Sequence, residues 1–282
     1  MRLKLVYEKP HTDWSVLEIF EGYKEILKNQ GHELIIELTN SLGSRDANKY
    51  GSPHTMVVEN LDNSKFLVIS YWDSAAAFFY ENNGWDQDKC CMVYTSSGVK
   101  NEEKITPISY PCYSKNMDSL HLSSIPLTSK PNNFLHFRGY LYGSRLTLSE
   151  NTEIEIVSQR LNFDAYIKEL TDNKICLSLN GAGEICNRDI EILGSRSVLF
   201  REKLNQSFHN SLVDGVHYIS FEHDVDPKKQ VKLIVDKFNE ISDNLELLSY
   251  ISENGYNWFK ENGTVNANIR ILNEVVNLEQ LL

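Results

Sequence analysis

The stretch Lys174–Phe200 (KICLSLNGAGEICNRDIEILGSRSVLF) places the tightest constraint on the fold of this chain. An apolar run, Lys174–Leu179, is typical of a buried strand and leads directly into the turn Asn180–Gly183. A helical pattern over Ile185–Leu193 follows, and then a second apolar strand, Ser197–Phe200. This succession of strand, glycine turn, helix and strand predicts an open α/β sheet with parallel strands.

The same alternation extends along the rest of the chain. In the first half, apolar patterns predict strands Leu3–Tyr7, Glu33–Leu38, Lys65–Tyr71 and Cys90–Tyr94, with helices over Val16–Leu27 and Ser74–Tyr80. The polar segment Thr39–Thr55 predicts a long loop. In the second half they predict strands Phe134–Phe137, Glu153–Val157 and His217–Phe221, and helices Phe163–Leu170, Lys228–Ile241, Leu245–Glu261 and Ala267–Leu281.

Chain length and one polar segment indicate two domains. The 282 residues are 41% hydrophobic, which is enough material for two domains of roughly 150 residues each. The segment His121–Asn133 (HLSSIPLTSKPNN) has two prolines and no apolar period, so it predicts a linker. We therefore expect one domain over residues 1–130 and a second over residues 131–264, with a cleft between them.

The charge balance excludes several classes of partner. A formal net charge of -11 argues against a nucleic-acid partner, because binding a phosphate backbone requires clustered Lys and Arg. It also argues against a basic membrane-binding face, and no apolar run approaches the ~18 residues of a membrane span. The cysteines have neither CxxC nor zinc-ligand spacing, which predicts reduced thiols in a cytoplasmic protein: Cys90, Cys91, Cys112, Cys176 and Cys186.

The glycine turn and the helix after it form a candidate anion site. Gly181 and Gly183 allow a backbone to approach a ligand closely, and the N–H groups at a helix start attract anions. Arg188 and Glu191 are three residues apart and share one helix face. The guanidinium suits a diphosphate, and the carboxylate suits two ribose hydroxyls. The alternative is a surface ladder of ion pairs among Glu184, Arg188 and Glu191.

A second stretch, FLHFRGYLYGSR (Phe134–Arg145), adds two arginines. Arg138 and Gly139 follow the first predicted strand of the second half, and Arg145 comes one loop later. If the strand ends face the cleft, both guanidinium groups can reach a pyrophosphate. The alternative is that either arginine caps a helix or pairs with a surface carboxylate.

These motifs resemble a known group of proteins. Arg138–Gly139 with Arg145, then Tyr166-x-x-x-Leu170, then KICLSLNGAGEICNRDIEILGS and a tail like YISENGYNWFKENGT stand in the order found in exostosin-like and CAP10-like glycosyltransferases. The similarity covers about Phe134–Thr264, and the N-terminal half has no comparable motif. The short chain without an anchor departs from the cellular exostosins and looks more like the compact xylosyltransferases of large viruses such as the chlorella viruses.

The resemblance implies an α/β fold of the GT-B class, with two Rossmann-like αβ domains facing a cleft. It places the nucleotide-sugar donor in the second domain and the acceptor in the first, with the last helix (265–282) packing back on the first domain. It assigns the ribose to Glu191 and the phosphates to Arg188, Arg138 and Arg145, and it puts His209 in the donor loop. The implied substrates are a UDP-sugar and an oligosaccharide or glycoprotein acceptor.

A general base is expected in the N-terminal half. Direct, inverting displacement needs a carboxylate or His to take the proton of the acceptor hydroxyl. Asp73 follows the strand Lys65–Tyr71, and His11 and Asp13 follow the first strand, so all three are candidates. Asp73 as a helix N-cap is the alternative. Trp14, Tyr71 and Trp72 are candidates to stack on acceptor sugars.

Neither metal nor cofactor is expected. The two D-x-D strings, Asp86-Gln-Asp88 and Asp224-Val-Asp226, lie in turn-like contexts and read as loop carboxylates. A metal-dependent GT-A transferase would use such a pair to hold Mg²⁺ or Mn²⁺ on the diphosphate. The leading hypothesis is thus a metal-independent glycosyltransferase, with a non-catalytic nucleotide- or carbohydrate-binding protein of the same fold as the alternative.

Overall fold

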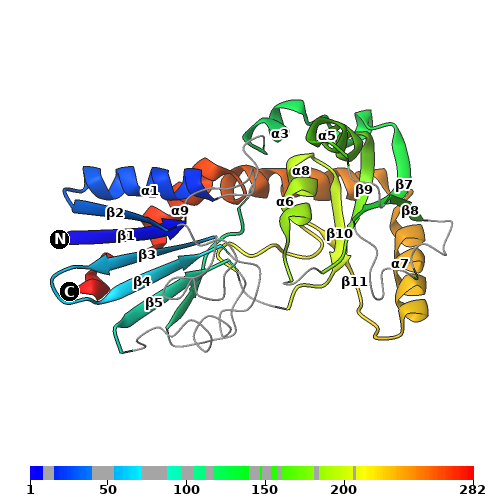
Figure 1. Cartoon of the computed structure of the whole chain (residues 1–282). Helices are drawn as coiled ribbons and strands as arrows, with labels where there is room; N and C mark the ends of the chain where they lie inside the picture. Colours follow the sequence, from blue (N-terminus) through cyan, green and yellow to red (C-terminus); the bar gives the residue numbers. More distant parts are fainter. Residues whose placement is uncertain are drawn as a thin grey trace.

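The chain folds around two separate β-sheets, one in each half of the sequence (Figure 1). The computed structural model describes residues 1–8, 16–39, 54–71, 88–96, 104–111, 117–139, 147, 154–157, 161–180, 184–205 and 208–282. None of the helices in these ranges combines the length and the apolar character needed to cross a bilayer.

The N-terminal sheet is mixed. Its strands are β1 (Arg2–Glu8), β2 (Glu33–Thr39), β3 (Thr55–Asn60), β4 (Phe66–Ser70), β5 (Cys90–Thr95) and β6 (Ile105–Pro107), in the order β2-β1-β3-β4-β5-β6. The central strand β3 runs antiparallel to both β1 and β4, whereas the other neighbouring strands pair in parallel. Helix α1 (Leu17–Asn29) covers one face and buries Ile19, Phe20, Tyr23 and Leu27.

The C-terminal sheet is entirely parallel. Its strands are β7 (Asn132–Arg138), β8 (Ile154–Val157), β9 (Asn173–Ser178), β10 (Val198–Glu202) and β11 (Ile219–Phe221), in the order β11-β10-β9-β7-β8. Strand order reverses between β7 and β9, because the chain leaves β7 toward β8 and then crosses back to β9. Open α/β sheets bind ligands at the carboxyl ends of the strands beside such a reversal.

Helices with local capping signals surround this sheet: α5 (Phe163–Asp172), α6 (Asn187–Gly194), α7 (Pro227–Ile241) and α8 (Leu245–Asn262). Asn162 and Asn244 cap α5 and α8 by accepting bonds from the backbone N–H groups of Ala165 and Leu247. Before β7 the chain forms α3 (Met117–Ser123) and the short 3-10 helix η1 (Leu127–Ser129).

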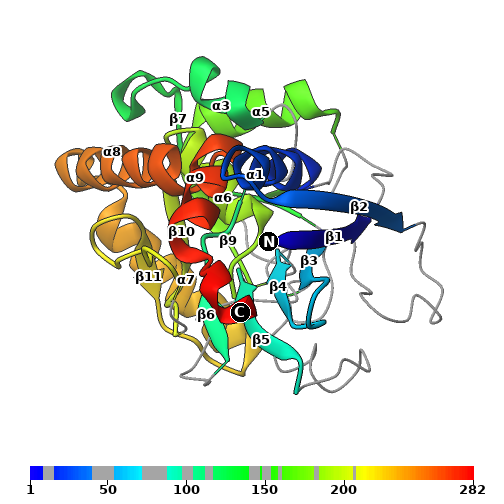
Figure 2. The same cartoon turned by 90° about the vertical axis from the view of Figure 1, so that its left-hand side faces the viewer.

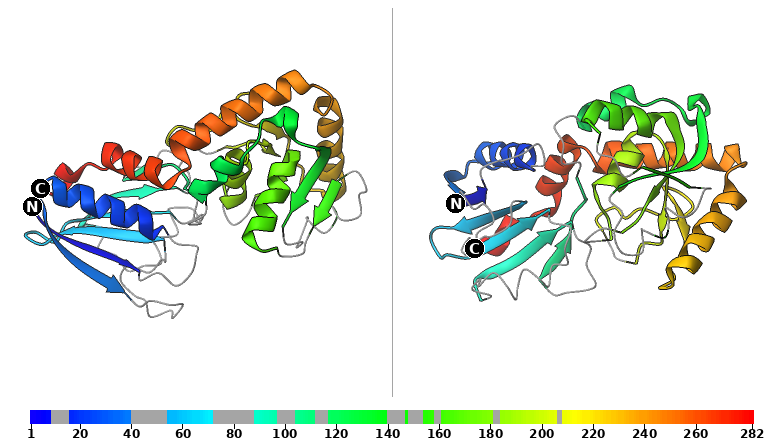
Figure 3. Two further views of the ribbon diagram at one scale, coloured as in Figure 1. Left: turned by 90° about the horizontal axis from the view of Figure 1, so that it is seen from above. Right: turned by 45° about the vertical axis from the view of Figure 1, so that its right-hand side comes forward.

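The end of the chain returns to the N-terminal sheet. Helix α8 leads into α9 (Val265–Val275) and the 3-10 helix η2 (Leu278–Leu281), which lie beside α1 and the N-terminal strands (Figures 2 and 3). Asn277 N donates to Tyr94 Oη (2.9 Å), and Asn60 Nδ2 donates to Leu281 O (3.0 Å). These two bonds join the last residues to β5 and β3.

A continuous apolar core links the halves. One cluster of buried side chains contains Tyr7 and Tyr94 from the first sheet together with Leu193 and Phe259 from α6 and α8. A second cluster fills the opposite face of the C-terminal sheet under α7 and α8. Side chains from both halves therefore pack in one cluster, so the two sheets are connected by packing as well as by the chain.

The structure departs from the sequence expectations at three places, one of which is the short strand β6, where no strand was expected. The expected linker His121–Asn133 includes part of α3, all of η1 and the first residues of β7. Strand β3 was not expected, although its burial is nearly complete. Its sequence, TMVVEN, is short and directly follows a polar stretch, so periodicity alone gave little sign of a strand.

Candidate functional site

The candidate site lies at the carboxyl edge of the C-terminal sheet, where strand order reverses. Arg138 ends β7 and Gly139 follows it, while Asn180 lies just beyond the end of β9. Helix α6 begins shortly after β9 and carries Arg188 near its first turn. The structure thus brings together three of the sequence-predicted donor residues, Arg138, Gly139 and Arg188.

Arg188 contributes a guanidinium group with an unused donor. The group lies over the Phe137 ring, with Cζ 4.9 Å from the ring centroid. Its Nη1 atom is buried and has no hydrogen-bond partner among the described residues. Burial disfavours the charge, but Cys186, Tyr166, Asp189 and Glu191 outweigh that effect and raise the Arg188 pKa. A buried cationic donor without a partner is costly, so the arrangement is suited to an anionic ligand.

Gly139 leaves the space that Arg188 occupies. A Cβ atom at Gly139 would lie 2.6 Å from Arg188 Nη2 and 3.1 Å from Phe137 Cζ. A side chain at this position would therefore push the guanidinium away from its place beside the strand end.

Glu191 lies one helical turn beyond Arg188 and is held by a tyrosine. Tyr166 of α5 donates its hydroxyl to Glu191 Oε2. Burial raises the pKa of the Glu191 carboxyl, while the Tyr166 bond and Arg188 act in the opposite direction. The pKa of Tyr166 is also raised, first by burial and then by the Glu191 charge. The alternative from the sequence was a surface row of ion pairs among Glu184, Arg188 and Glu191. The described hydrogen bond of Glu191 is instead to Tyr166.

Arg138 is engaged by a carboxylate. Its Nε and Nη2 both donate to Glu169 of α5. The buried His136 ring lies between two carboxylates, with Nδ1 2.7 Å from Glu155 Oε2 and Nε2 2.7 Å from Glu169 Oε1. Glu169 therefore contacts His136 and balances the charge of Arg138, which leaves Arg188 as the better anion-binding group.

Sequence reasoning missed a buried arginine at the same edge. Arg201, in β10, is 1% exposed, and its Nη1 lies 2.9 Å from Asp189 Oδ2. Its Nη2 donates to Asn180 Oδ1 and to Glu184 O. The available signal was a charged residue directly after the apolar run Val198–Phe200.

Two further candidates are placed by the structure. The carbonyl oxygen of His209 accepts a bond from Ser109 Oγ of the N-terminal half (3.2 Å). Partial burial lowers the pKa of the His209 ring, with Glu274 acting in the opposite direction. Tyr71 is completely buried and packs near Phe20, with ring centroids 6.1 Å apart, so its ring offers no exposed face to a sugar.

The remaining candidates lie outside the described residues. They are the three possible bases, two aromatic residues proposed for the acceptor, and three donor residues: His11, Asp13, Asp73, Trp14, Trp72, Arg145, Gly181 and Gly183.

The second D-x-D string belongs to a helix cap. Asp226 accepts bonds from the N–H groups of Lys228 and Lys229 at the start of α7, and Asp224 Oδ1 accepts one from Asp226 N. In the part of the chain that the structure describes, no three His, Cys, Asp or Glu side chains gather as a metal site would require.

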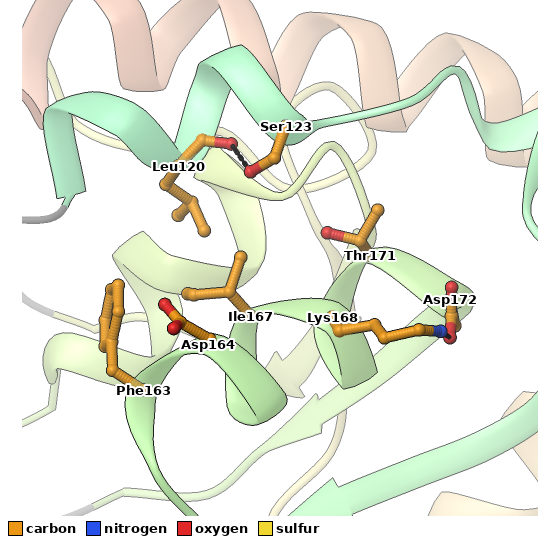
Figure 4. A pocket seen from close by; sticks show the side chains of 8 residues that line it. All are labelled: Leu120, Ser123, Phe163, Asp164, Ile167, Lys168, Thr171 and Asp172. Atoms are coloured by element: carbon orange, nitrogen blue, oxygen red, sulfur yellow. Dashed lines mark hydrogen bonds and ion pairs between the residues drawn. The ribbon is translucent and has the colours of Figure 1, made fainter.

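A cavity of about 440 Å³ lies away from this edge, between α3 and α5 (Figure 4). Leu120 and Ser123 line it from α3, and α5 contributes Phe163, Ile167 and the Lys168–Asp172 ion pair. Neither Arg188 nor Glu191 lines this cavity. We therefore place the candidate donor site by its charged groups at the sheet edge and not by this cavity.

Comparison with known proteins gives likeness in structure only. No protein-family model matches the chain, and no curated protein matches it in sequence. An alpha-glucosyltransferase solved with UDP and a DNA 13-mer is similar, with a TM-score of 0.54, 8% identity, and coverage of 97% of this chain and 99% of that one.

Two further solved structures are also similar over most of their length. Anabaena HepE in complex with UDP and glucose has a TM-score of 0.52 at 8% identity, covering 95% of this chain and 98% of that one. A glycosyltransferase from Rickettsia africae has a TM-score of 0.50 at 13% identity, covering 95% and 83%. The chain has the α/β fold of GT-B glycosyltransferases, as expected from the sequence.

Proposed function

We propose that this protein is a UDP-sugar-dependent glycosyltransferase that binds its donor at the carboxyl edge of the C-terminal sheet. The observation that carries the proposal is the buried Nη1 of Arg188, which has no hydrogen-bond partner in the described part of the chain. It lies beside Gly139, at the point where strand order reverses. A diphosphate supplies the oxygen acceptors that this guanidinium lacks.

The first turn of α6 supports the same ligand. Backbone N–H groups at a helix start favour an anion, and Arg188 adds a full positive charge beside them. Glu191, oriented by Tyr166, is our candidate for the ribose hydroxyl groups of the donor. Fold neighbours solved with UDP favour uridine as the base.

The finer parts of the proposal come from the resemblance to exostosin-like enzymes. They are a xylose donor, a glycan acceptor, inverting displacement and a cytoplasmic enzyme of viral type. The alpha-glucosyltransferase neighbour was solved with DNA in three structures. The net charge of -11 nevertheless favours a glycan for this chain, since DNA binding needs a basic surface. Asp73, His11 and Asp13 remain the proposed bases, with Asp73 first.

Nucleotide binding is the first test. UDP, GDP and ADP are compared by thermal shift, and UDP at 100 times its Kd should add about 2.7 kcal/mol to the free energy of unfolding. Arg188→Met should abolish most of the shift with UDP, and Glu191→Ala should do the same. Wild-type affinity for UDP in Arg188→Met would overturn the proposal.

Arg196→Met is a matched control for Arg188→Met. Arg196 also stacks on an aromatic ring, with Cζ 5.2 Å from the Tyr256 centroid, and it pairs with Glu253 (Nε–Oε2 2.8 Å). It follows the C-terminal end of α6, whereas Arg188 lies near the N-terminal end. This variant should lose some stability and keep the UDP shift.

Turnover is the second test. UDP release from UDP-xylose and UDP-glucose is measured with a panel of glycan acceptors, and Asp73→Asn is expected to keep UDP binding and lose turnover. Near-normal turnover in Asp73→Asn would reject that residue as the base. UDP binding without turnover of any donor would instead support the non-catalytic alternative.

A further inference from the structure

Arg201 is the most deeply buried cationic side chain at the candidate donor edge. It is 1% exposed and lies in β10, next to β9 in the parallel sheet. A buried guanidinium carries a large desolvation cost unless its donors are used and its charge is balanced. The partners of Arg201 therefore show which segments its burial holds in place.

The partners of Arg201 come before and after residues 181–183 in the chain. Nη2 donates to Asn180 Oδ1 (2.8 Å), just before residues 181–183, and to Glu184 O, just after them. Nε donates to Glu202 O (3.0 Å). One guanidinium thus joins Asn180 and Glu184 to strand β10.

The same side chain also reaches the start of α6. Its Nη1 lies 2.9 Å from Oδ2 of Asp189, which is itself fully buried. Asp189 Oδ2 accepts a bond from Cys186 N (2.7 Å), so it caps the helix while it pairs with Arg201. Asp189 directly follows Arg188 in the chain.

We propose that Arg201 is a positioning residue for donor binding, because it fixes Asn180 and Glu184, which flank residues 181–183, and the first turn of α6 that carries Arg188. The inference rests on the proposed function, since it assigns Arg201 a role in binding UDP. Arg201 itself does not contact the donor: it acts through Asn180, Glu184 and Asp189.

The experiment needs variants that remove the tether without leaving a buried charge. Arg201→Met alone would strand the Asp189 carboxylate, so the main variant is Arg201→Met with Asp189→Asn, which is neutral and keeps an oxygen to cap Cys186 N. Arg201→Lys keeps the charge but cannot bridge all the partners. Arg196→Met, at the other end of α6, is the control.

Two measurements are made on each folded variant, well below its melting temperature. Amide hydrogen exchange reports the order of residues 184–189 without ligand, and isothermal titration gives the UDP Kd. We expect faster exchange and a Kd weakened on the order of tenfold or more in the double variant, because misalignment of one charge-assisted hydrogen bond can cost about 10- to 100-fold in affinity. Arg201→Lys should be intermediate.

Loss of stability alone would not produce this pattern. Arg196→Met should keep the wild-type Kd even where its melting temperature falls as far as that of the double variant. A wild-type Kd in the double variant would overturn the positioning role. Absence of UDP binding in the wild-type protein itself would instead overturn the proposed function.

Discussion

The two halves of the molecule bury different kinds of polar group. In the described residues of the C-terminal half, four side chains of Lys, His, Asp or Arg are less than 3% exposed: Lys130, His136, Asp189 and Arg201. The buried polar side chains in the described residues of the N-terminal half are all neutral: Thr55, Asn60, Ser70, Thr95, Ser96 and Ser109. A buried charge needs specific partners, because leaving it unpaired costs more free energy than leaving a neutral polar group unpaired.

The difference shows how each sheet is held. In the C-terminal half, Arg201 forms hydrogen bonds at the carboxyl edge of the sheet. Lys130 forms hydrogen bonds at the C-terminal ends of α5 and α6. Lys130 Nζ donates to Thr171 O (2.7 Å) and Ser195 O (2.9 Å), so one cation caps two helix C-termini. We infer that the half proposed to bind a charged donor is the half whose geometry is set by charge.

The largest expected effect comes from breaking the buried ion pair. Asp189→Ala leaves Arg201 buried without its counter-charge and removes the cap of α6, so it should lower the free energy of unfolding by about 3–5 kcal/mol. Ser70→Ala, at an equally buried neutral position in β4, should cost about 0.5–1.5 kcal/mol. Urea denaturation of both variants measures the contrast, and equal losses would remove the distinction between the halves.

Lys130 predicts a smaller, pH-dependent effect. Burial lowers the Lys130 pKa to about 8 from 10.5, with Cys176 and Asp172 opposing the shift and Arg196 adding to it. The unfolded state then binds more protons than the folded state between pH 8 and 10.5, so this group makes the protein more stable as pH rises through that window. Across this window, full deprotonation of Lys130 raises the free energy of unfolding by up to about 3 kcal/mol.

Lys130→Met separates the pH dependence of stability due to Lys130 from that due to other titrating groups. The difference in unfolding free energy, wild type minus variant, should rise between pH 8 and 10.5. The variant should be about 1–3 kcal/mol less stable at pH 7, because the Thr171 and Ser195 carbonyls lose a donor. A difference that stays flat with pH would contradict the lowered pKa.

Two glycine substitutions give the finest test. Gly22→Ala in α1 should cost about 1–3 kcal/mol, because the new Cβ would lie 2.3 Å from Ile269 Cδ1 of α9. Gly139→Ala should cost less than about 1 kcal/mol, since Arg188 can swing away, but it should weaken UDP binding roughly tenfold. Thermal melts and UDP titrations of both variants separate packing from binding, and the reverse pattern would reject the site.

Much of the fold could be predicted because its signals are local. The apolar runs of β1, β2, β4, β5 and β7–β11 and the helices α1 and α5–α9 were expected to within a few residues. Strand β3 was missed because its six residues directly follow a polar stretch and give little periodic signal. The short helices before β7 were missed because prolines and serines suggested a linker.

The candidate site was predictable to a smaller extent. The spacing of Arg188 and Glu191 correctly put both on α6, whereas the close approach of Arg188 to Gly139 was not expected. Pairing of Arg138 with a carboxylate was the alternative, but Glu169 was not identified as the partner, because it lies 31 positions and a whole strand further along the chain. Tyr71 was expected at a surface and is buried, since a residue just after a strand end can pack inward as readily as outward.

The amino-acid sequence by itself determined which segments become strands and helices and where glycine interrupts them, because those preferences act within a few residues. Only the tertiary structure decided which charges meet. Arg201 reaches Asp189 and Lys130 reaches two helix ends because strand order brings those elements together. The partner of a buried charge depends on the packing of distant segments, and no local pattern specifies it.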